Sequence, residues 1–132
     1  MHEVLSAQSL GARRCAPLNA SQRMESSEVQ AQCALLPRWA ERDGMLVASF
    51  EFPDWLTTLA FVNALGWIAH EQDHHPDLLI SYSRCEVRWA THSAGGITLN
   101  DFICAARVDA LVPTQPDTAA QTDPRLGPRP SA

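Results

Sequence analysis

Three of the five histidines lie close together in the second half of the chain: His74, His75 and His92. Histidine has an ordinary pKa of about 6.5, so it both gives and accepts protons at neutral pH. Carboxylates stand near these histidines in the sequence, at Asp73 and Asp101. This combination of residue types is typical of a site for general acid–base chemistry. Proton transfer is therefore the first hypothesis for what the chain does.

Each of these residues also has a structural interpretation. A His-His pair near the C-terminal end of a helix can simply offset the helix dipole. His92 precedes Gly95 and Gly96 closely and could be a solvated loop residue. Asp101 stands three residues after Thr98, which is the spacing of a capping box at the start of a helix. For Asp101, a helix cap and a site residue are equally good interpretations.

A metal centre is a third hypothesis for the histidines. His70 and His74 have the i, i+4 spacing of a helical ligand pair, and His92 could complete a three-histidine set. No Glu or Cys is spaced to complete the site convincingly. Adjacent His74 and His75 cannot easily face one ion from regular structure. Acid–base chemistry without a metal is therefore favoured.

Composition excludes several classes of function. The formal net charge of −5 argues against nucleic acid as a partner. All ten basic residues are arginine, which excludes Schiff-base lysine chemistry and a P-loop lysine. Residues 1–20 contain no apolar stretch of signal-peptide length, and no run reaches the about 20 apolar residues of a membrane span. A cytoplasmic protein with no membrane partner is expected.

The four cysteines have no metal-type spacing and form no CxxC pair. They stand at Cys15, Cys33, Cys85 and Cys104, in apolar or tail contexts without an obvious basic activator. The sequence therefore predicts four isolated thiols in a reducing compartment, none of them a catalytic nucleophile.

One domain with two tails is expected. The length of 132 residues suits a single compact unit, and 45 % hydrophobic residues supply material for one core. Residues 1–23 have no sustained periodicity and are predicted to be a flexible segment. Residues 24–111 form the predicted domain. Residues 112–132 are rich in Pro, Thr, Gln and Asp and are predicted to be disordered.

Hydrophobic periodicity predicts the elements that position the histidines. They are a helix over 26–36 capped by Ser26 or Ser27, strands at 39–40 and 45–52 around an Asp43-Gly44 turn, a helix over 54–72 capped by Asp54, strands over 78–82 and 84–91, and a helix over 98–111. This order indicates an α+β fold, an antiparallel sheet with helices on one face. The double histidine would then end the long helix, and His92 would follow the last strand.

The long helix is expected to pack broadly on the sheet. Its apolar stripe runs from Trp55 through Leu65 to Ala69, and Leu56, Phe61 and Trp67 would widen it.

Taken together, these residues resemble the signature of the pterin-4a-carbinolamine dehydratases (4a-hydroxytetrahydrobiopterin dehydratases) of bacterial type. The likeness covers roughly residues 25–111. It rests on Asp73-His74-His75-Pro76-Asp77, Tyr82, Val87, Thr91-His92, Gly95-Gly96, Thr98 and Asp101-Phe102, with Asp43-Gly44 and residues 59–64 upstream.

The resemblance implies a four-stranded antiparallel sheet with about three helices packed on one face. It implies the dehydration of 4a-hydroxytetrahydropterin to quinonoid dihydropterin, without a metal or an organic cofactor. That product supports tetrahydrobiopterin recycling for aromatic amino acid hydroxylases, such as phenylalanine hydroxylase, which would be a candidate partner. A homodimer or homotetramer is also implied.

The resemblance assigns roles to individual residues. His74 and His92 match the acid–base pair, and His75 matches the residue that binds and orients the pterin. Substrate-binding positions correspond to Asp73, His75, Pro76, Thr91, Asp101 and Trp39. The chain departs from the family at His70, where a Glu is frequent.

A non-catalytic role is the alternative. Animal members of the family also act as dimerisation cofactors of a transcription factor, so the chain could instead stabilise a hydroxylase or a regulator. The intact set of three histidines argues against this, because binding alone does not require it.

Overall fold

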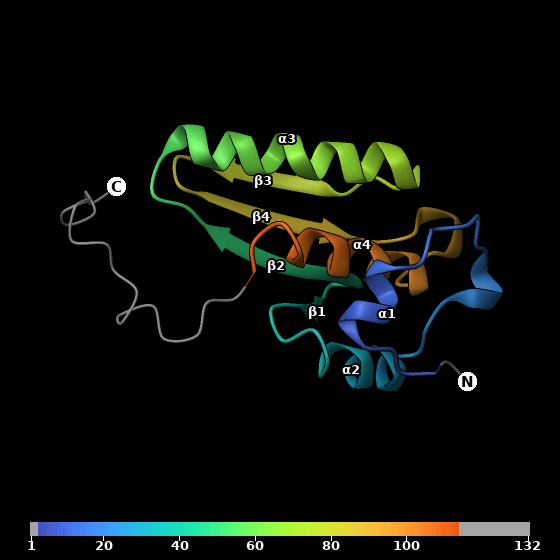
Figure 1. Cartoon of the computed structure of the whole chain (residues 1–132). Helices are drawn as coiled ribbons and strands as arrows, with labels where there is room; N and C mark the ends of the chain where they lie inside the picture. The colour runs from blue at the N-terminus through green and yellow to red at the C-terminus, as the bar shows by residue number, and fades with distance from the viewer. Residues whose placement is uncertain (1–2, 114–132) are drawn as a thin grey trace.

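The computed structural model describes residues 3–113 of the chain (Figure 1). Its elements are α1 (Ala7–Gly11), η1 (Ala20–Gln22), α2 (Ser26–Cys33), β1 (Ala40–Arg42), β2 (Met45–Glu51), α3 (Trp55–Gln72), β3 (Asp77–Ser81), β4 (Arg84–Trp89), η2 (His92–Ala94) and α4 (Leu99–Asp109). The strands form one sheet in the order β1-β2-β4-β3, and every neighbouring pair is antiparallel. The predicted α+β fold with a four-stranded antiparallel sheet is confirmed.

Alternating side chains give the sheet one buried face. On β4, Cys85, Val87 and Trp89 are fully buried, as their spacing predicted. They pair across the sheet with Phe50, Ala48 and Leu46 of β2, which are also buried. The predicted turn between β1 and β2 is present as well. Asp43 and Gly44 both adopt positive φ angles, 53° and 75°, as a two-residue hairpin turn requires.

Helices α3 and α4 cover the buried face of the sheet (Figure 1). Helix α3 begins at its predicted cap, where Oδ1 of Asp54 accepts a hydrogen bond from the Thr57 N–H at 2.7 Å. Phe61, Leu65 and Ala69 form the buried side of this helix.

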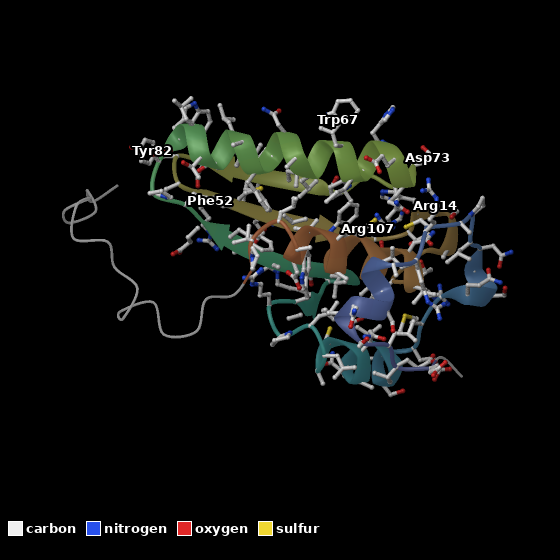
Figure 2. The ribbon with its side chains drawn as sticks, viewed as in Figure 1. Arg14, Phe52, Trp67, Asp73, Tyr82 and Arg107 are labelled. Atoms are coloured by element: carbon white, nitrogen blue, oxygen red, sulfur yellow. The ribbon has the colours of Figure 1, made fainter. Side chains whose placement is uncertain are left out.

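The expectation that α3 packs broadly on the sheet is wrong for Leu56 and Trp67, whereas Phe61 is buried as expected. Leu56 and Trp67 are 76 % and 67 % exposed, and Figure 2 shows Trp67 projecting from the side of the helix away from the strands. A helix lying on a sheet buries one stripe only, and these two side chains fall on the opposite side. The outer side of α3 is thus apolar and uncovered in the single chain.

The first predicted helix begins at Ser26 as expected, but its capping residue is Glu25 and not Ser26 or Ser27. Glu25 is the capping residue of α2, and its backbone N–H donates a hydrogen bond to Oε1 of Glu28 at 3.1 Å. The Glu28 carboxylate, in the first turn, thus satisfies the backbone N–H of the capping residue, as in a capping box.

Residues 3–23 are part of the packed domain, in contrast to the flexible segment that was expected over 1–23. Leu10 of α1 is fully buried in the core. The buried Gln32 amide bonds both backbone groups of Leu5, from Leu5 N to Oε1 at 2.9 Å and from Nε2 to Leu5 O at 2.7 Å. Hydrogen bonds from side-chain amides thus fix this segment. Because such contacts need no hydrophobic periodicity, the sequence of the segment did not indicate that it is ordered.

The predicted disordered tail over 112–132 is described only at its start. Residues 114–132 lie outside the described residues. None of the helices within 3–113 combines the length and hydropathy that a membrane crossing needs.

Candidate active site

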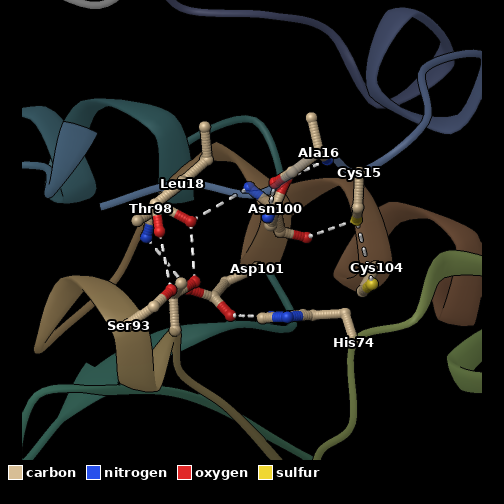
Figure 3. Close-up of polar contacts among 10 residues, drawn as sticks. Cys15, Ala16, Leu18, His74, Ser93, Thr98, Asn100, Asp101 and Cys104 are labelled. Carbon is tan, nitrogen blue, oxygen red and sulfur yellow. Dashed lines mark hydrogen bonds and ion pairs between the residues drawn. The ribbon is translucent and has the colours of Figure 1, made fainter.

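The best-defined polar contact of the histidine region joins His74 to Asp101 (Figure 3). His74 follows the C-terminal end of α3, and Asp101 lies in the first turn of α4. Nε2 of His74 is 2.6 Å from Oδ1 of Asp101. The Asp101 side chain is fully buried and that of His74 is 11 % exposed. The sequence placed these two residues in one site, and the structure brings them into direct contact.

The second oxygen of Asp101 completes the capping box of α4. Oδ2 accepts hydrogen bonds from the Thr98 N–H at 2.9 Å and from Oγ1 of Thr91 at 2.8 Å. The two threonine hydroxyls are themselves 2.7 Å apart. Asp101 therefore belongs to the capping box of α4 and also contacts His74. The two interpretations of the sequence are compatible because a carboxylate has two oxygens.

The His74 ring lies on Trp89, the last residue of β4. The ring centroids are 5.5 Å apart and the planes differ by only 7°. Trp89 is fully buried, and its indole N–H has no hydrogen-bond partner among the described residues. The imidazole is thus held flat against the core by stacking and fixed in its plane by Asp101.

This environment raises the pKa of His74. Burial alone would lower it, since it disfavours the charged imidazolium. The hydrogen bond to Asp101 and the negative charge of that carboxylate outweigh burial and raise the pKa above its ordinary value. Protonated His74 is therefore more populated at neutral pH than a free imidazole would be.

His75 and His92 are exposed to solvent beside this contact. His75 directly follows His74, and His92 directly follows Thr91, whose hydroxyl bonds Asp101. His92 begins the short helix η2, which ends at Gly95 with a φ of 73°, a conformation that favours glycine. The hydrogen bond between Thr91 and Asp101 thus connects the two predicted acid–base histidines, because His92 follows Thr91 and His74 contacts Asp101.

The turn between α3 and β3 carries two further predicted binding residues. Asp73 caps α3 in the left-handed conformation with a φ of 49°, and its side chain is exposed. Pro76 is half-buried and precedes β3. The left-handed turn ends the helix and lets the chain pass His74 inward and His75 outward.

Two other residues singled out from the sequence lie elsewhere. Trp39 is 3 % exposed, and its indole N–H donates to Oδ1 of Asp109, at the opposite end of α4 from Asp101. This places Trp39 in the core and not beside the histidines. His70 lies on the exposed side of α3, where its ring meets that of Trp67 edge-on at 6.0 Å.

The three-histidine metal hypothesis gains no geometric support. Within residues 3–113, no three His, Cys, Asp or Glu side chains come together as metal ligands would. His70 points to a different surface, and Nε2 of His74 is occupied by Asp101.

Two hollows in the surface lie away from His74, His75 and His92. One, of about 440 Å³, runs between α1, the end of α2 and the end of α4, and the other, of about 280 Å³, lies over Asn63, Gly66, Trp67 and His70 of α3. Neither is lined by His74, His75 or His92. The case for a site at the histidines therefore rests on side-chain contacts and not on the depth of a cavity.

The N-terminal segment borders the site, which the sequence did not indicate. The Cys15 N–H donates to Oε1 of Gln72 at 2.8 Å, two residues before His74. Ala16 exchanges two hydrogen bonds with the Asn100 amide, at 3.1 and 2.7 Å, one residue before Asp101. Figure 3 shows this segment passing over the start of α4. Isolated Gln and Asn residues give no pattern in a sequence, so no signal marked these contacts.

The prediction of four isolated thiols is wrong for one pair. Sγ of Cys15 lies 3.6 Å from Sγ of Cys104, and both remain free thiols. The segment expected to be flexible brings Cys15 to α4, so the pair forms only in the folded chain.

Comparison with known proteins shows which family the chain belongs to. The family described as "Pterin 4 alpha carbinolamine dehydratase" matches residues 22–111, which include the histidines, Thr91 and Asp101. The chain belongs to this family. The bacterial resemblance noted in the sequence is thereby confirmed, and residues 3–21 lie before the matched range.

Individual relatives of the family cover most of the chain. A protein of Chromobacterium violaceum named "Putative pterin-4-alpha-carbinolamine dehydratase" is 43 % identical over 97 residues, 74 % of this chain and 90 % of that protein. One of Stenotrophomonas maltophilia with the same name is 43 % identical over 110 residues, 81 % of this chain and 95 % of that protein. The crystal structure of a transcriptional coactivator/pterin dehydratase from Brucella melitensis superimposes with a TM-score of 0.65 at 32 % identity. It covers 67 % of this chain and 97 % of its own.

Proposed function

We propose that this chain dehydrates 4a-hydroxytetrahydropterin to quinonoid dihydropterin and water by histidine acid–base catalysis. The observation that supports this best is the buried contact between His74 and Asp101 at 2.6 Å, in a chain that belongs to the pterin carbinolamine dehydratase family. A buried carboxylate that orients an imidazole and raises its pKa is a common arrangement at sites of proton transfer.

The reaction needs two proton transfers. The leaving 4a-hydroxyl takes up a proton and departs as water, and a ring N–H of the pterin gives up a proton to a base. Asp101 occupies Nε2 of His74, so Nδ1 is the nitrogen available to the substrate. Since the pKa of His74 is raised, we assign this residue the acid role towards the hydroxyl. His92 is then the base for the ring N–H.

The neighbouring residues would bind the pterin and support the pair. His75 and Asp73 are exposed beside His74 and would contact the pterin, and Pro76 would shape the same turn. Thr91 is 4 % exposed and bonds Asp101, so its expected contribution is to position the carboxylate. For Trp39 we propose a structural role in place of the expected substrate contact. No metal or organic cofactor takes part in this proposal.

The cellular setting belongs to the same proposal. The product would feed tetrahydrobiopterin recycling for an aromatic amino acid hydroxylase in the cytoplasm. The free thiols fit a reducing compartment. A homodimer or homotetramer would cover the exposed apolar side chains of α3 and of the β3–β4 hairpin, which are Trp55, Leu56, Trp67, Leu79, Ile80 and Tyr82.

The first test is the decay of 4a-hydroxytetrahydropterin, followed by ultraviolet absorbance, with and without added protein. Acceleration that survives prior treatment of the protein with a metal chelator supports the proposal. A folded protein that does not accelerate the decay contradicts it. Acceleration that the chelator abolishes contradicts the metal-free mechanism and supports the hypothesis of a three-histidine metal site.

A non-catalytic partner role is the second candidate. The uncovered apolar side of α3 favours it, as does the similarity to a Brucella protein described as a transcriptional coactivator as well as a pterin dehydratase. Under this alternative, a protein inactive towards the pterin would bind a hydroxylase or a regulator in a stoichiometric complex. The outcome that would replace the catalytic proposal has two parts. The wild type forms such a complex but shows no pterin turnover, and Trp67→Ala fails to form the complex.

A further inference from the structure

Two thiols from distant parts of the chain meet beside the proposed site. Cys15, in the N-terminal segment, and Cys104, in the middle of α4, are 89 residues apart in sequence, and their Sγ atoms lie 3.6 Å apart. Figure 3 draws them next to His74 and Asn100. A disulfide has an Sγ–Sγ distance of about 2.05 Å, so the two atoms need to approach by only about 1.5 Å.

The two thiols differ in exposure and in acidity. Cys15 is half-exposed, whereas Cys104 is fully buried. The hydrogen bond from Cys104 lowers the pKa of Cys15, and the positive charges of His74 and Arg107 act in the same direction, against burial and the negative charge of Asp101. The pKa of Cys104 is raised by its hydrogen bond to Cys15 and by burial. Cys15 is therefore the thiol that an oxidant reaches and the better nucleophile, and Cys104 keeps its proton.

The other two cysteines lack these properties. Cys33 and Cys85 are buried, and burial raises the pKa of each thiol. No second sulfur contacts either of them among the described residues. They serve as internal controls for any reaction of Cys15 and Cys104.

We propose that Cys15 and Cys104 are a redox pair, which hydrogen peroxide converts to a disulfide that fixes the N-terminal segment to α4 beside His74. The Cys15 thiolate attacks the O–O bond, giving a sulfenic acid, and the displaced hydroxide takes up a proton to form water. Cys104 then attacks the sulfenic sulfur, and its proton leaves with the second hydroxide as water. Two thiols are oxidised by two electrons, and one peroxide is reduced to two waters.

The disulfide would act on both sides of the His74–Asp101 contact. Cys15 is hydrogen-bonded to Gln72, and its neighbour Ala16 to Asn100. Gln72 stands two residues before His74, and Asn100 one residue before Asp101. Closing the sulfur pair draws the segment that carries these bonds towards α4. A small-molecule thiol reverses the step, because two of its molecules reduce the disulfide and leave as their own disulfide.

The chain is well suited to mapping this bond. With no lysine, trypsin cuts only after arginine and places the four cysteines in four peptides, residues 15–23, 24–38, 85–88 and 89–107. The full-length protein is treated with a small excess of hydrogen peroxide, denatured with iodoacetamide and digested without reductant. We expect one linked species, 15–23 joined to 89–107, which dithiothreitol abolishes. Peptides 24–38 and 85–88 should carry only alkylated cysteine.

Two variants and a second readout make the test decisive. Cys15→Ser should abolish the linked species, and the matched change Cys33→Ser should leave it intact. In the wild type and in Cys33→Ser, peroxide should raise Tm by at least about 5 °C, because the bond closes a loop of most of the domain. Cys15→Ser should show no such rise. Linkage through Cys33 or Cys85, or oxidation of Cys15 to sulfinic acid with Cys104 left reduced, would overturn the proposal. It does not depend on the proposed dehydratase activity, since no pterin enters the test.

Discussion

Asp101 ties the end of one helix to the start of another through a single contact with His74. Its Oδ1 atom lies 2.6 Å from Nε2 of His74, while its Oδ2 atom accepts from the Thr98 N–H at 2.9 Å. The same carboxylate therefore caps the N-terminus of α4 and sets the protonation of the imidazole that follows α3. The capping of α4 and the protonation of His74 are therefore coupled at this residue.

Replacing Asp101 with Asn should lower the pKa of His74, because burial is then no longer outweighed by a negative charge. We expect dehydratase turnover at neutral pH to fall by about 10-fold or more. The pKa is read from the His74 ring resonances in an NMR titration. Asp109→Asn removes another partly buried carboxylate of α4, which bonds Trp39, and should leave the His74 titration unchanged. An unaltered His74 pKa in Asp101→Asn would refute the coupling.

The His74–Asp101 contact should also make stability depend on pH. Because the folded pKa of His74 is raised, the protonated ring contributes fully below about pH 6.5, its unfolded pKa. That contribution is lost as the pH rises through the folded pKa. Urea unfolding of the wild type and His74→Gln between pH 6 and 9 measures it. The difference in unfolding free energy should shrink as the pH rises, and a growing difference would have the wrong sign.

Much of this geometry is predictable from sequence because it is local. The alternation of Cys85, Val87 and Trp89 gave the buried face of β4, and the spacing of Thr98 and Asp101 gave the capping box. The residue types of His74 and Asp101 predicted that the two belong to one site. Their direct contact could not be predicted, because it joins residues 27 positions apart and depends on how α3 and α4 pack.

Trp89 should contribute to stability more than to chemistry. It is fully buried and lies flat under the His74 ring at 5.5 Å. Trp89→Ala should lower the free energy of unfolding by about 3–5 kcal/mol, through the lost burial and the cavity left behind. Trp89→Phe keeps an aromatic ring and removes an indole N–H that has no partner in the described residues, so it should cost much less. Equal losses in the two variants, measured by urea unfolding, would contradict this account of the stack.

Asn100 should anchor the N-terminal segment. Its side-chain amide bonds both the N–H and the carbonyl of Ala16, at 3.1 and 2.7 Å. Asn100→Ala leaves these groups without partners and should cost about 1–3 kcal/mol. It should also speed tryptic cleavage after Arg13 and Arg14. The matched variant Asn63→Ala changes an exposed Asn on α3 and should alter neither property. Unchanged cleavage in Asn100→Ala would show that the segment is held elsewhere.

The N-terminal segment shows why the remainder of the fold could not be predicted from the sequence. Its contacts run through single side chains, Gln32 to Leu5 and Gln72 to Cys15, over 27 and 57 positions of sequence. Such pairs have no period and no motif, so the segment gave the signal of a tail. For the same reason, the contact of Cys15 with Cys104 was not predicted. The prediction for the outer side of α3 was wrong for a different reason. The sequence alone does not reveal which surface, if any, covers an apolar residue such as Trp67.

The acid–base role of two histidines is tested most directly by turnover of 4a-hydroxytetrahydropterin in single variants. His74→Ala and His92→Ala should each slow the reaction by about 100-fold or more, the usual contribution of one general acid or base. His70→Ala is the matched control, because this histidine lies on the exposed side of α3 against Trp67 and should leave turnover unchanged. Folding of each variant is checked by circular dichroism. Full activity in folded His74→Ala and His92→Ala would contradict the mechanism.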